Sequence, residues 1–101
     1  MGTFLLQNIS VDTVGAGIMA DGSNKALAVW TTTGGSFGGG SVTINGSPDG
    51  GVTWIPLTYN GAPAVFTSNT ILLIDRLSMG MEIQAVLSGS SGASNVNAAI
   101  F

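Results

Sequence analysis

The chain of 101 residues contains neither histidine nor cysteine, and only 7% of its residues are charged. Without histidine it lacks the usual acid or base for catalysis near neutral pH. Without cysteine it has no thiolate nucleophile, no disulfide and no soft metal ligand. Its few, scattered acids are Asp12, Asp21, Asp49, Asp75 and Glu82. We therefore predict that the protein is not an enzyme, with no catalytic residue and no cofactor.

Two of the acids, Asp12 and Asp21, lie in an irregular N-terminal stretch and could offer oxygen ligands to a hard cation such as calcium. No dense spacing of oxygen ligands surrounds them, so we predict no metal site. Asp75 directly precedes Arg76, which favours an exposed ion pair, and Glu82 falls on the polar side of an alternating segment.

Basic residues are equally scarce, because two Lys and Arg side chains face five acids and the net charge is −3. This balance repels phosphate and provides no basic stripe for DNA or RNA. No stretch approaches the roughly 20 apolar residues of a membrane-spanning helix. We therefore expect neither a nucleic acid nor a membrane as a partner.

Apolar residues make up 45% of the chain and occur in short runs. A typical globular domain has about 25% charged residues, so this chain has unusually few charges with which to cover its surface. Such a surface leaves apolar patches that favour association. We predict that the protein buries much of its surface against copies of itself or within a larger lattice. A Ser/Thr-rich monomer is the alternative.

Strand-like apolar runs follow one another at intervals of about ten residues, and no segment has a convincing helical pattern. The expected strands are residues 4–9, 25–33, 41–46, 52–58, 64–67, 70–75, 81–87 and 94–101. They predict an all-β chain: a single β-sandwich or jelly-roll domain of about eight short antiparallel strands. We assign residues 1–24 to an N-terminal strand and irregular arm and residues 25–101 to the β-sandwich, within one domain overall.

The pattern also predicts sides and connections. The last strand alternates Val96, Ala98 and Ile100 against Asn95 and Asn97. The glycine-rich residues 34–40 lack the Lys-Ser/Thr ending of a phosphate-binding loop, so we expect a strand connection there, anchored to the core by its phenylalanine at position 37. Aromatic residues in small β-sandwiches are usually buried, and we place those of this chain mainly in the core.

The eight residues 47–54 predict a tight β-hairpin turn between residues 41–46 and 52–58. Glycines at the turn can take positive φ, and a neighbouring carboxylate can accept backbone N–H groups. The spacing resembles the Asp-box, Ser-x-Asp-x-Gly-x-Thr-Trp, which in sialidases is a structural hairpin remote from the active site. The motif occurs once here and implies folding rather than catalysis. Its residues are Ser47, Asp49, Gly50, Gly51, Thr53 and Trp54.

Residues 25–101 also resemble small phage and prophage virion proteins. The resemblance lies in a glycine-rich segment before a strand (38–44), in the hairpin (47–54), and in Gly-Met-Glu-Ile-Gln-Ala-Val-Leu-Ser-Gly (80–89) before a short last strand. It implies a structural virion component assembled in the host cytoplasm, such as a capsid decoration (cement) protein. The implied partners are copies of itself, with a trimer as one option, and the major capsid protein or another virion protein.

Hydrophobic termini in a chain with little charge predict subunit contacts, for instance as a strand added to a neighbour's sheet. The predicted interface residues are Phe4, Leu5, Leu6, Ile9, Ile100 and Phe101. The alternatives are a tail, fibre or neck subunit and a carbohydrate-binding β-sandwich that presents an exposed Trp or Tyr. A bacterial surface or pilus-like subunit is a further, less favoured possibility.

Overall fold

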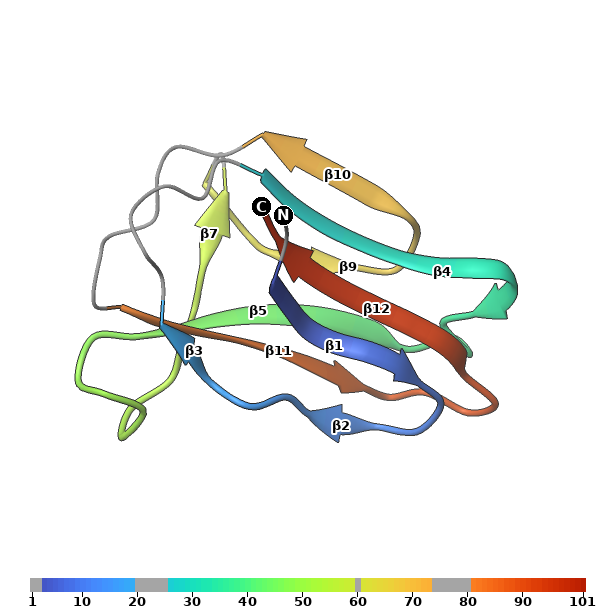
Figure 1. Cartoon of the computed structure of the whole chain (residues 1–101), viewed down its shortest axis with the longest axis horizontal. Helices are drawn as coiled ribbons and strands as arrows, with labels where there is room; N and C mark the ends of the chain where they lie inside the picture. The colour runs from blue at the N-terminus through green and yellow to red at the C-terminus, as the bar shows by residue number, and fades with distance from the viewer. Residues whose placement is uncertain (1–2, 20–25, 60, 74–80) are drawn as a thin grey trace.

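The computed structural model describes residues 3–19, 26–59, 61–73 and 81–101 (Figure 1). The regular elements in these ranges are all β-strands, which confirms the all-β prediction. None of these ranges contains a helix long and apolar enough to cross a membrane. Asp21, Asp75 and Arg76 lie outside the described residues. The strands are β1 (Thr3–Ile9), β2 (Thr13–Val14), β3 (Ile18–Met19), β4 (Ala26–Ser36), β5 (Ser41–Ser47), β6 (Ile55–Pro56), β7 (Thr58–Tyr59), β8 (Ala62–Pro63), β9 (Val65–Phe66), β10 (Thr70–Leu73), β11 (Glu82–Ser88) and β12 (Ser94–Ile100).

The strands form two larger antiparallel sheets and a small ribbon. Sheet A has four strands in the order β1-β12-β4-β10. Sheet B has the order β2-β11-β5-β6, with β3 also paired to β11 and β9 to β5, and β7 pairs with β8. Figure 1 shows β10, β4, β12 and β1 side by side, with β5 and β11 running below them. Both sheets therefore combine strands from distant parts of the sequence.

The core lies between the two sheets and is built from alternate residues of their central strands. It is almost entirely aliphatic, and Phe37, at 9% exposure, is its one buried aromatic among the described residues. The buried side chains come from β4 (Leu27, Val29), β5 (Val42, Ile44), β11 (Ile83, Ala85, Leu87) and β12 (Val96, Ala98, Ile100). The predicted core side of the last strand and the anchoring role of Phe37 are thus confirmed.

The N-terminal strand β1 is part of this core. Its register shifts between Phe4, which pairs with Ala99, and Leu6, which pairs with Ala98. Such an irregularity lets neighbouring residues face the same side, and Leu5 and Leu6 are both buried in the core. Because β2 and β3 also pair with β11, residues 3–19 belong to the two sheets rather than to an arm apart from them.

The last strand, β12, lies between β1 and β4 and is paired on both sides. It therefore has no unpaired edge to add to a neighbour's sheet, which corrects that expectation for the C-terminal strand. Its Asn97, expected on a polar side, is buried, and the Asn97 side chain accepts the N–H of Asn8 at 2.9 Å. Asn8 has a φ of 52°, so the amide caps a second irregularity in β1.

Candidate functional site

The predicted hairpin is present, and Ser47 and Asp49 hold its turn. Ser47 Oγ donates to Asp49 Oδ1 and accepts from the N–H of Gly51, both at 2.8 Å. Asp49 Oδ1 also accepts the N–H of Thr53 at 2.8 Å. The bonds from Thr53, followed by that from Ser47, hold the pKa of the Asp49 carboxyl below its ordinary value. This carboxylate is therefore part of the turn.

Backbone geometry explains the two glycines of the turn. Gly50 and Gly51 have φ values of 76° and 94°, as the sequence predicts, and a side chain at either position would be strained. The returning strand β6 pairs Ile55 with Gly46 and Pro56 with Asn45. It is shorter than the predicted 52–58 because the turn bonds continue as far as Thr53.

Trp54 closes the hairpin against the segment that links β2 to β3. A Cβ atom at Gly17 would come within 2.9 Å of Trp54 Cη2 and within 2.7 Å of Glu82 Oε1. The half-buried Trp54 ring and Glu82 thus lie over Gly17, and one of these side chains would have to shift to admit a Cβ atom there. The predicted motif, Ser47 to Trp54, thus holds the hairpin turn and packs its tryptophan against sheet B.

Asp12 fastens the loop before β2 to the loop after β11. Its carboxylate accepts the backbone N–H groups of Gly89 (3.2 Å) and Ser90 (2.9 Å) and the Ser90 hydroxyl. The bond from the Ser90 hydroxyl is the main reason why the pKa of Asp12 lies below its ordinary value. No group of three potential metal-binding acids occurs within the described ranges. These contacts give Asp12 a structural role.

The predicted interface residues divide into two groups. Leu5, Leu6 and Ile100 are in the core, so within this fold they cannot contact another subunit, because their side chains already pack between the sheets. Phe4 is 43% exposed and Phe101 is 48% exposed. The prediction for these two remains open, as it does for the partly buried Ile9.

Phe4 and Phe101 lie on the outer face of sheet A, the side directed away from sheet B. Strand register aligns Phe4 (β1), Ala99 (β12), Ala28 (β4) and Ile71 (β10) in one row across this face. Ala28 and Ala99 are buried although neither belongs to the core between the sheets. We attribute their burial to the larger side chains beside them on the outer face.

Those larger side chains are aromatic or aliphatic. The rings of Phe4 and Trp30 are 5.9 Å apart, with an angle of 41° between their planes. Phe101 is held beside Ala26 by two backbone hydrogen bonds of 2.9 and 3.2 Å. Leu73 pairs with Ala26 from the other side. Ile71 and Leu73 are 76% and 78% exposed, so the face presents apolar side chains to its surroundings.

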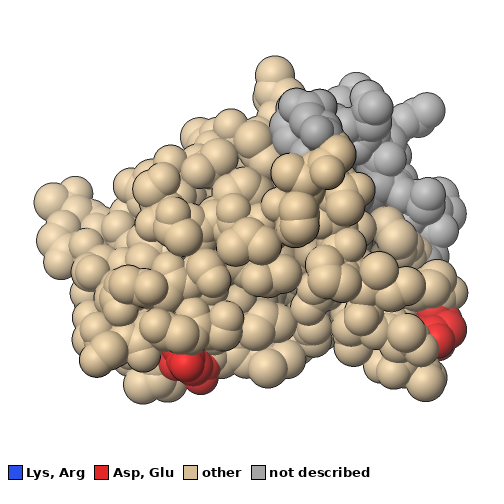
Figure 2. All heavy atoms as spheres, turned by 180° about the vertical axis from the view of Figure 1, so that it is seen from behind, with Lys and Arg blue, Asp and Glu red and all other residues tan. Residues whose placement is uncertain are grey.

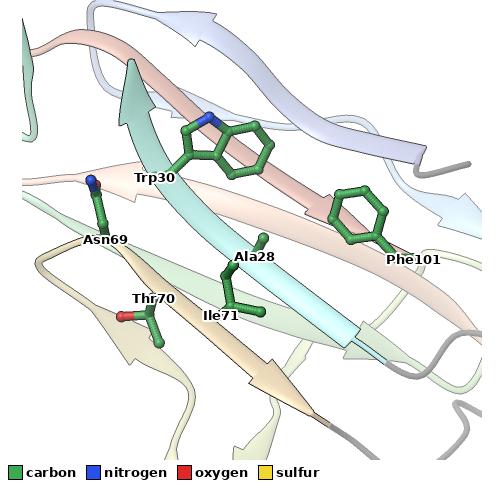
Figure 3. Close-up of a pocket in the computed structure, with 6 residues that line it drawn as sticks. All are labelled: Ala28, Trp30, Asn69, Thr70, Ile71 and Phe101. Carbon is green, nitrogen blue, oxygen red and sulfur yellow. The ribbon is translucent and has the colours of Figure 1, made fainter. Parts of the chain in front are cut away.

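A groove of about 690 Å³ runs between these side chains (Figure 3). Figure 3 shows the Trp30 and Phe101 rings on one side, with Ala28 and Ile71 opposite them. Asn69 supplies a polar group at one end, where its Oδ1 accepts the N–H of Thr31 at 2.9 Å. The lining residues are Ala28, Trp30, Asn69, Thr70, Ile71 and Phe101.

The outer face carries no charge among the described residues. The described acids are Asp12 in a loop, Asp49 in the hairpin and Glu82 on β11. None of them is on a strand of sheet A. Seen from behind, the molecule shows one small acidic area at its lower edge and one at its right edge, and its described residues show no basic area (Figure 2). Both basic residues, Lys25 and Arg76, lie outside the described ranges.

The importance of Trp30 and Ile71 did not follow from the sequence patterns, and the expected burial of the aromatics needs correction. Phe4 and Phe101 are exposed, and Trp30 is only partly buried. One signal was present: along β4, Ala26, Ala28 and Trp30 alternate with Leu27 and Val29. Such alternation shows which residues share a side of the strand. Because both sides of β4 are apolar, it does not show which side faces the core.

No family model matches this chain, and comparison with curated proteins and with solved structures gives no match either. The function is therefore proposed from the residues and their arrangement.

Proposed function

We propose that this protein is a non-enzymatic structural subunit of a phage particle: a capsid decoration protein that stabilises the head lattice as a homo-oligomer. The observation that supports it best is the uncharged, apolar outer face of sheet A, where Ile71 and Leu73 are largely exposed. Large contiguous apolar patches are rare on monomeric soluble proteins and mark interaction sites. Neighbours in a lattice can cover such a face repeatedly, in high copy number.

Strand order supports the same proposal at the level of fold. We take β2 and β3 as one interrupted strand, because both pair with β11, and β6 and β9 as another, because both pair with β5. Leaving the β7–β8 ribbon aside, the order becomes 1-8-3-6 in sheet A and 2-7-4-5 in sheet B. On the basis of this order we propose that the two sheets form a jelly-roll β-sandwich. Jelly rolls occur in viral capsid proteins and in lectins, so this support is a fold-level analogy.

The physical role follows from what the surface can contribute. Apolar area removed from water stabilises a contact by about 25 cal/mol per Å², and a subunit with few charges meets little repulsion when it is packed against its neighbours. Asp12 and Asp49 are engaged in loop contacts, and neither is placed on the outer face. The proposed protein therefore acts through shape and burial.

The test is the composition of virus particles purified from cells that carry the coding sequence. We expect the chain to co-purify with the particles in a fixed ratio to the major capsid protein, and cryo-electron microscopy to show it on the outside of the head. Particles made without it should break at a lower temperature. A chain that stays in the particle-free fraction would contradict the proposal, and density only at the neck or tail would assign it there instead.

A carbohydrate-binding role is the second candidate, because the groove combines the Trp30 ring with Asn69, whose amide nitrogen can donate to a sugar hydroxyl. The lining is otherwise mainly apolar, which suits a protein surface better than a sugar. Titration calorimetry with a panel of oligosaccharides separates the two roles. Saturable binding that is lost in Trp30→Ala and kept in Trp54→Phe would favour the sugar site.

A further inference from the structure

The outer face of sheet A is complementary in shape to a second copy of the same face. Small residues, Ala28 and Ala99, form a floor across the two central strands. Large side chains stand around this floor, including Phe4 on β1 and Ile71 on β10. The groove of about 690 Å³ beside Ala28 is large enough to receive an aromatic or branched aliphatic side chain. The surface thus carries both projections and the hollow into which projections of the same kind fit.

Charge favours the same pairing. A twofold contact brings each residue of a face near its own copy or near a neighbour of that copy, so any charged face would meet like charge. The strands of sheet A contribute no charged residue among those described. Among the described residues of this face, a partner recognised through charge would find no counterpart, whereas a second copy would meet no like charge.

The area is also sufficient. Four strands at a spacing of about 4.8 Å and about seven residues at about 3.3 Å give a footprint of roughly 19 by 23 Å. Two such faces cover about 900 Å² before side-chain relief is counted, which brings the total to roughly the 1,000 Å² of a specific interface. Without such a partner, Ile71 and Leu73 stay more than three-quarters exposed, at 76% and 78%.

We infer that the outer face of sheet A binds the same face of a second copy of this chain, about a twofold axis, with Ile71 and Phe101 of each copy directed toward the other copy's groove. This names a partner for the surface on which the proposed function rests. Sheets packed in this way lie about 10 Å apart with their strands roughly aligned. The dimer is then the unit that is offered to a lattice.

Sedimentation equilibrium of the full chain, over roughly a hundredfold range of concentration, tests the inference. The wild type should approach twice the chain mass of 10.1 kDa as concentration rises. Ile71→Glu places two like charges in the contact and should weaken association at least about tenfold. Phe101→Ser removes a ring but keeps the backbone bonds to Ala26, and it should act in the same direction.

Val14→Glu is the matched control, because Val14 is 68% exposed on β2 of sheet B. It adds the same charge away from the proposed contact and should leave the dimer unchanged. Circular dichroism and thermal unfolding establish that each variant folds. Since Ile71 and Phe101 are both exposed, we expect the folds to survive the substitutions.

Three results would overturn the inference: a wild type of 10.1 kDa at every concentration, a trimer, or Ile71→Glu and Phe101→Ser variants that associate as tightly as Val14→Glu. The particle experiment separates this inference from the proposed function. A chain that is present on the head but monomeric in solution would end the dimer and keep the decoration role. A dimer that is absent from particles would do the reverse.

Discussion

At the scale of single residues, a few polar side chains satisfy backbone groups that turns and bulges leave without ladder partners. Ser47 is fully buried, and its hydroxyl serves both Asp49 and Gly51. Asn97 does the same for Asn8 in β1. No buried side-chain nitrogen or oxygen among the described residues is left without a partner. Each of these side chains should therefore matter more for stability than its size suggests.

The first prediction concerns Ser47. Ser47→Ala removes the acceptor of the Gly51 N–H and the donor to Asp49, and should lower the free energy of unfolding by about 1 to 2 kcal/mol. Urea denaturation measures the change. Ser68→Ala is the control, because Ser68 is exposed and contributes only its backbone carbonyl to Thr70. Equal stability of the two variants would contradict the assigned role of Ser47.

The second prediction concerns acid. Hydrogen bonds lower the folded-state pKa of Asp12 and Asp49 below the ordinary value of 3.8. A depressed pKa contributes stability above the unfolded value, and this contribution is lost as pH falls through the folded value. Wild-type stability, measured by urea unfolding, should therefore fall between about pH 5 and about pH 2. Asp49→Asn should lose less over that interval; an identical loss in both proteins would exclude this carboxylate as a cause.

The hairpin shows how far sequence reasoning reaches at this scale. The Ser-x-Asp-x-Gly-x-Thr-Trp spacing predicted the turn and its glycines because the bonds are local, within four residues. The alternation of the last strand placed Asn97 on a polar side, and its burial could not be predicted because its partner Asn8 is 89 positions away. Such a bond depends on which strands become neighbours, and no local pattern contains that information.

At the scale of elements, strand β12 determines much of the fold. It is a central strand of sheet A, paired with β1 and β4. Apolar alternation predicted its core side correctly, whereas the apolar character of the chain's end, with little charge nearby, wrongly predicted a strand free to join a neighbour's sheet. The alternation of a strand reports its two sides, whereas its place at an edge or centre depends on strands elsewhere in the sequence. The burial of both Leu5 and Leu6 in β1 could likewise not be predicted, because a bulge interrupts the alternation of side chains between the two faces of a strand.

The third prediction concerns Gly15, where the backbone after β2 packs closely against β1 of sheet A and β11 of sheet B. Gly15 donates its N–H to the carbonyl of Ala85 at 2.9 Å, and a Cβ atom there would lie 2.6 Å from the Leu5 carbonyl oxygen and 2.8 Å from that of Ala85. Backbone atoms cannot yield cheaply, so Gly15→Ala should destabilise the fold by about 1 to 3 kcal/mol.

Thermal or urea unfolding measures the effect of Gly15→Ala. The neighbouring Ala16→Ser substitution is the control, because Ala16 is exposed and a surface change of this kind stays within about 0.5 kcal/mol. A Gly15→Ala protein as stable as the control would show that the two sheets do not meet this closely at Gly15.

At the scale of the whole molecule, the scarcity of charge and the uncovered face of sheet A have one physical explanation. The low content of charged residues, 7%, predicted an apolar surface that another subunit covers, but it did not predict where on the molecule that surface lies. The strand pairing locates it, because register brings Phe4, Ala99, Ala28 and Ile71 into one row. Composition reports how much apolar surface must be covered, while only the pairing of distant strands decides where.

The most direct measurement of the central claim, that another subunit covers this face, is the fluorescence of Trp30. Trp54→Phe leaves Trp30 as the only tryptophan of the chain. As protein concentration rises, its emission should shift to shorter wavelength and its quenching by acrylamide should decrease, because the Trp30 ring passes from a groove open to water into an interface. Adding Ile71→Glu should abolish both changes. Emission and quenching that stay constant at every concentration, with and without Ile71→Glu, would contradict the claim.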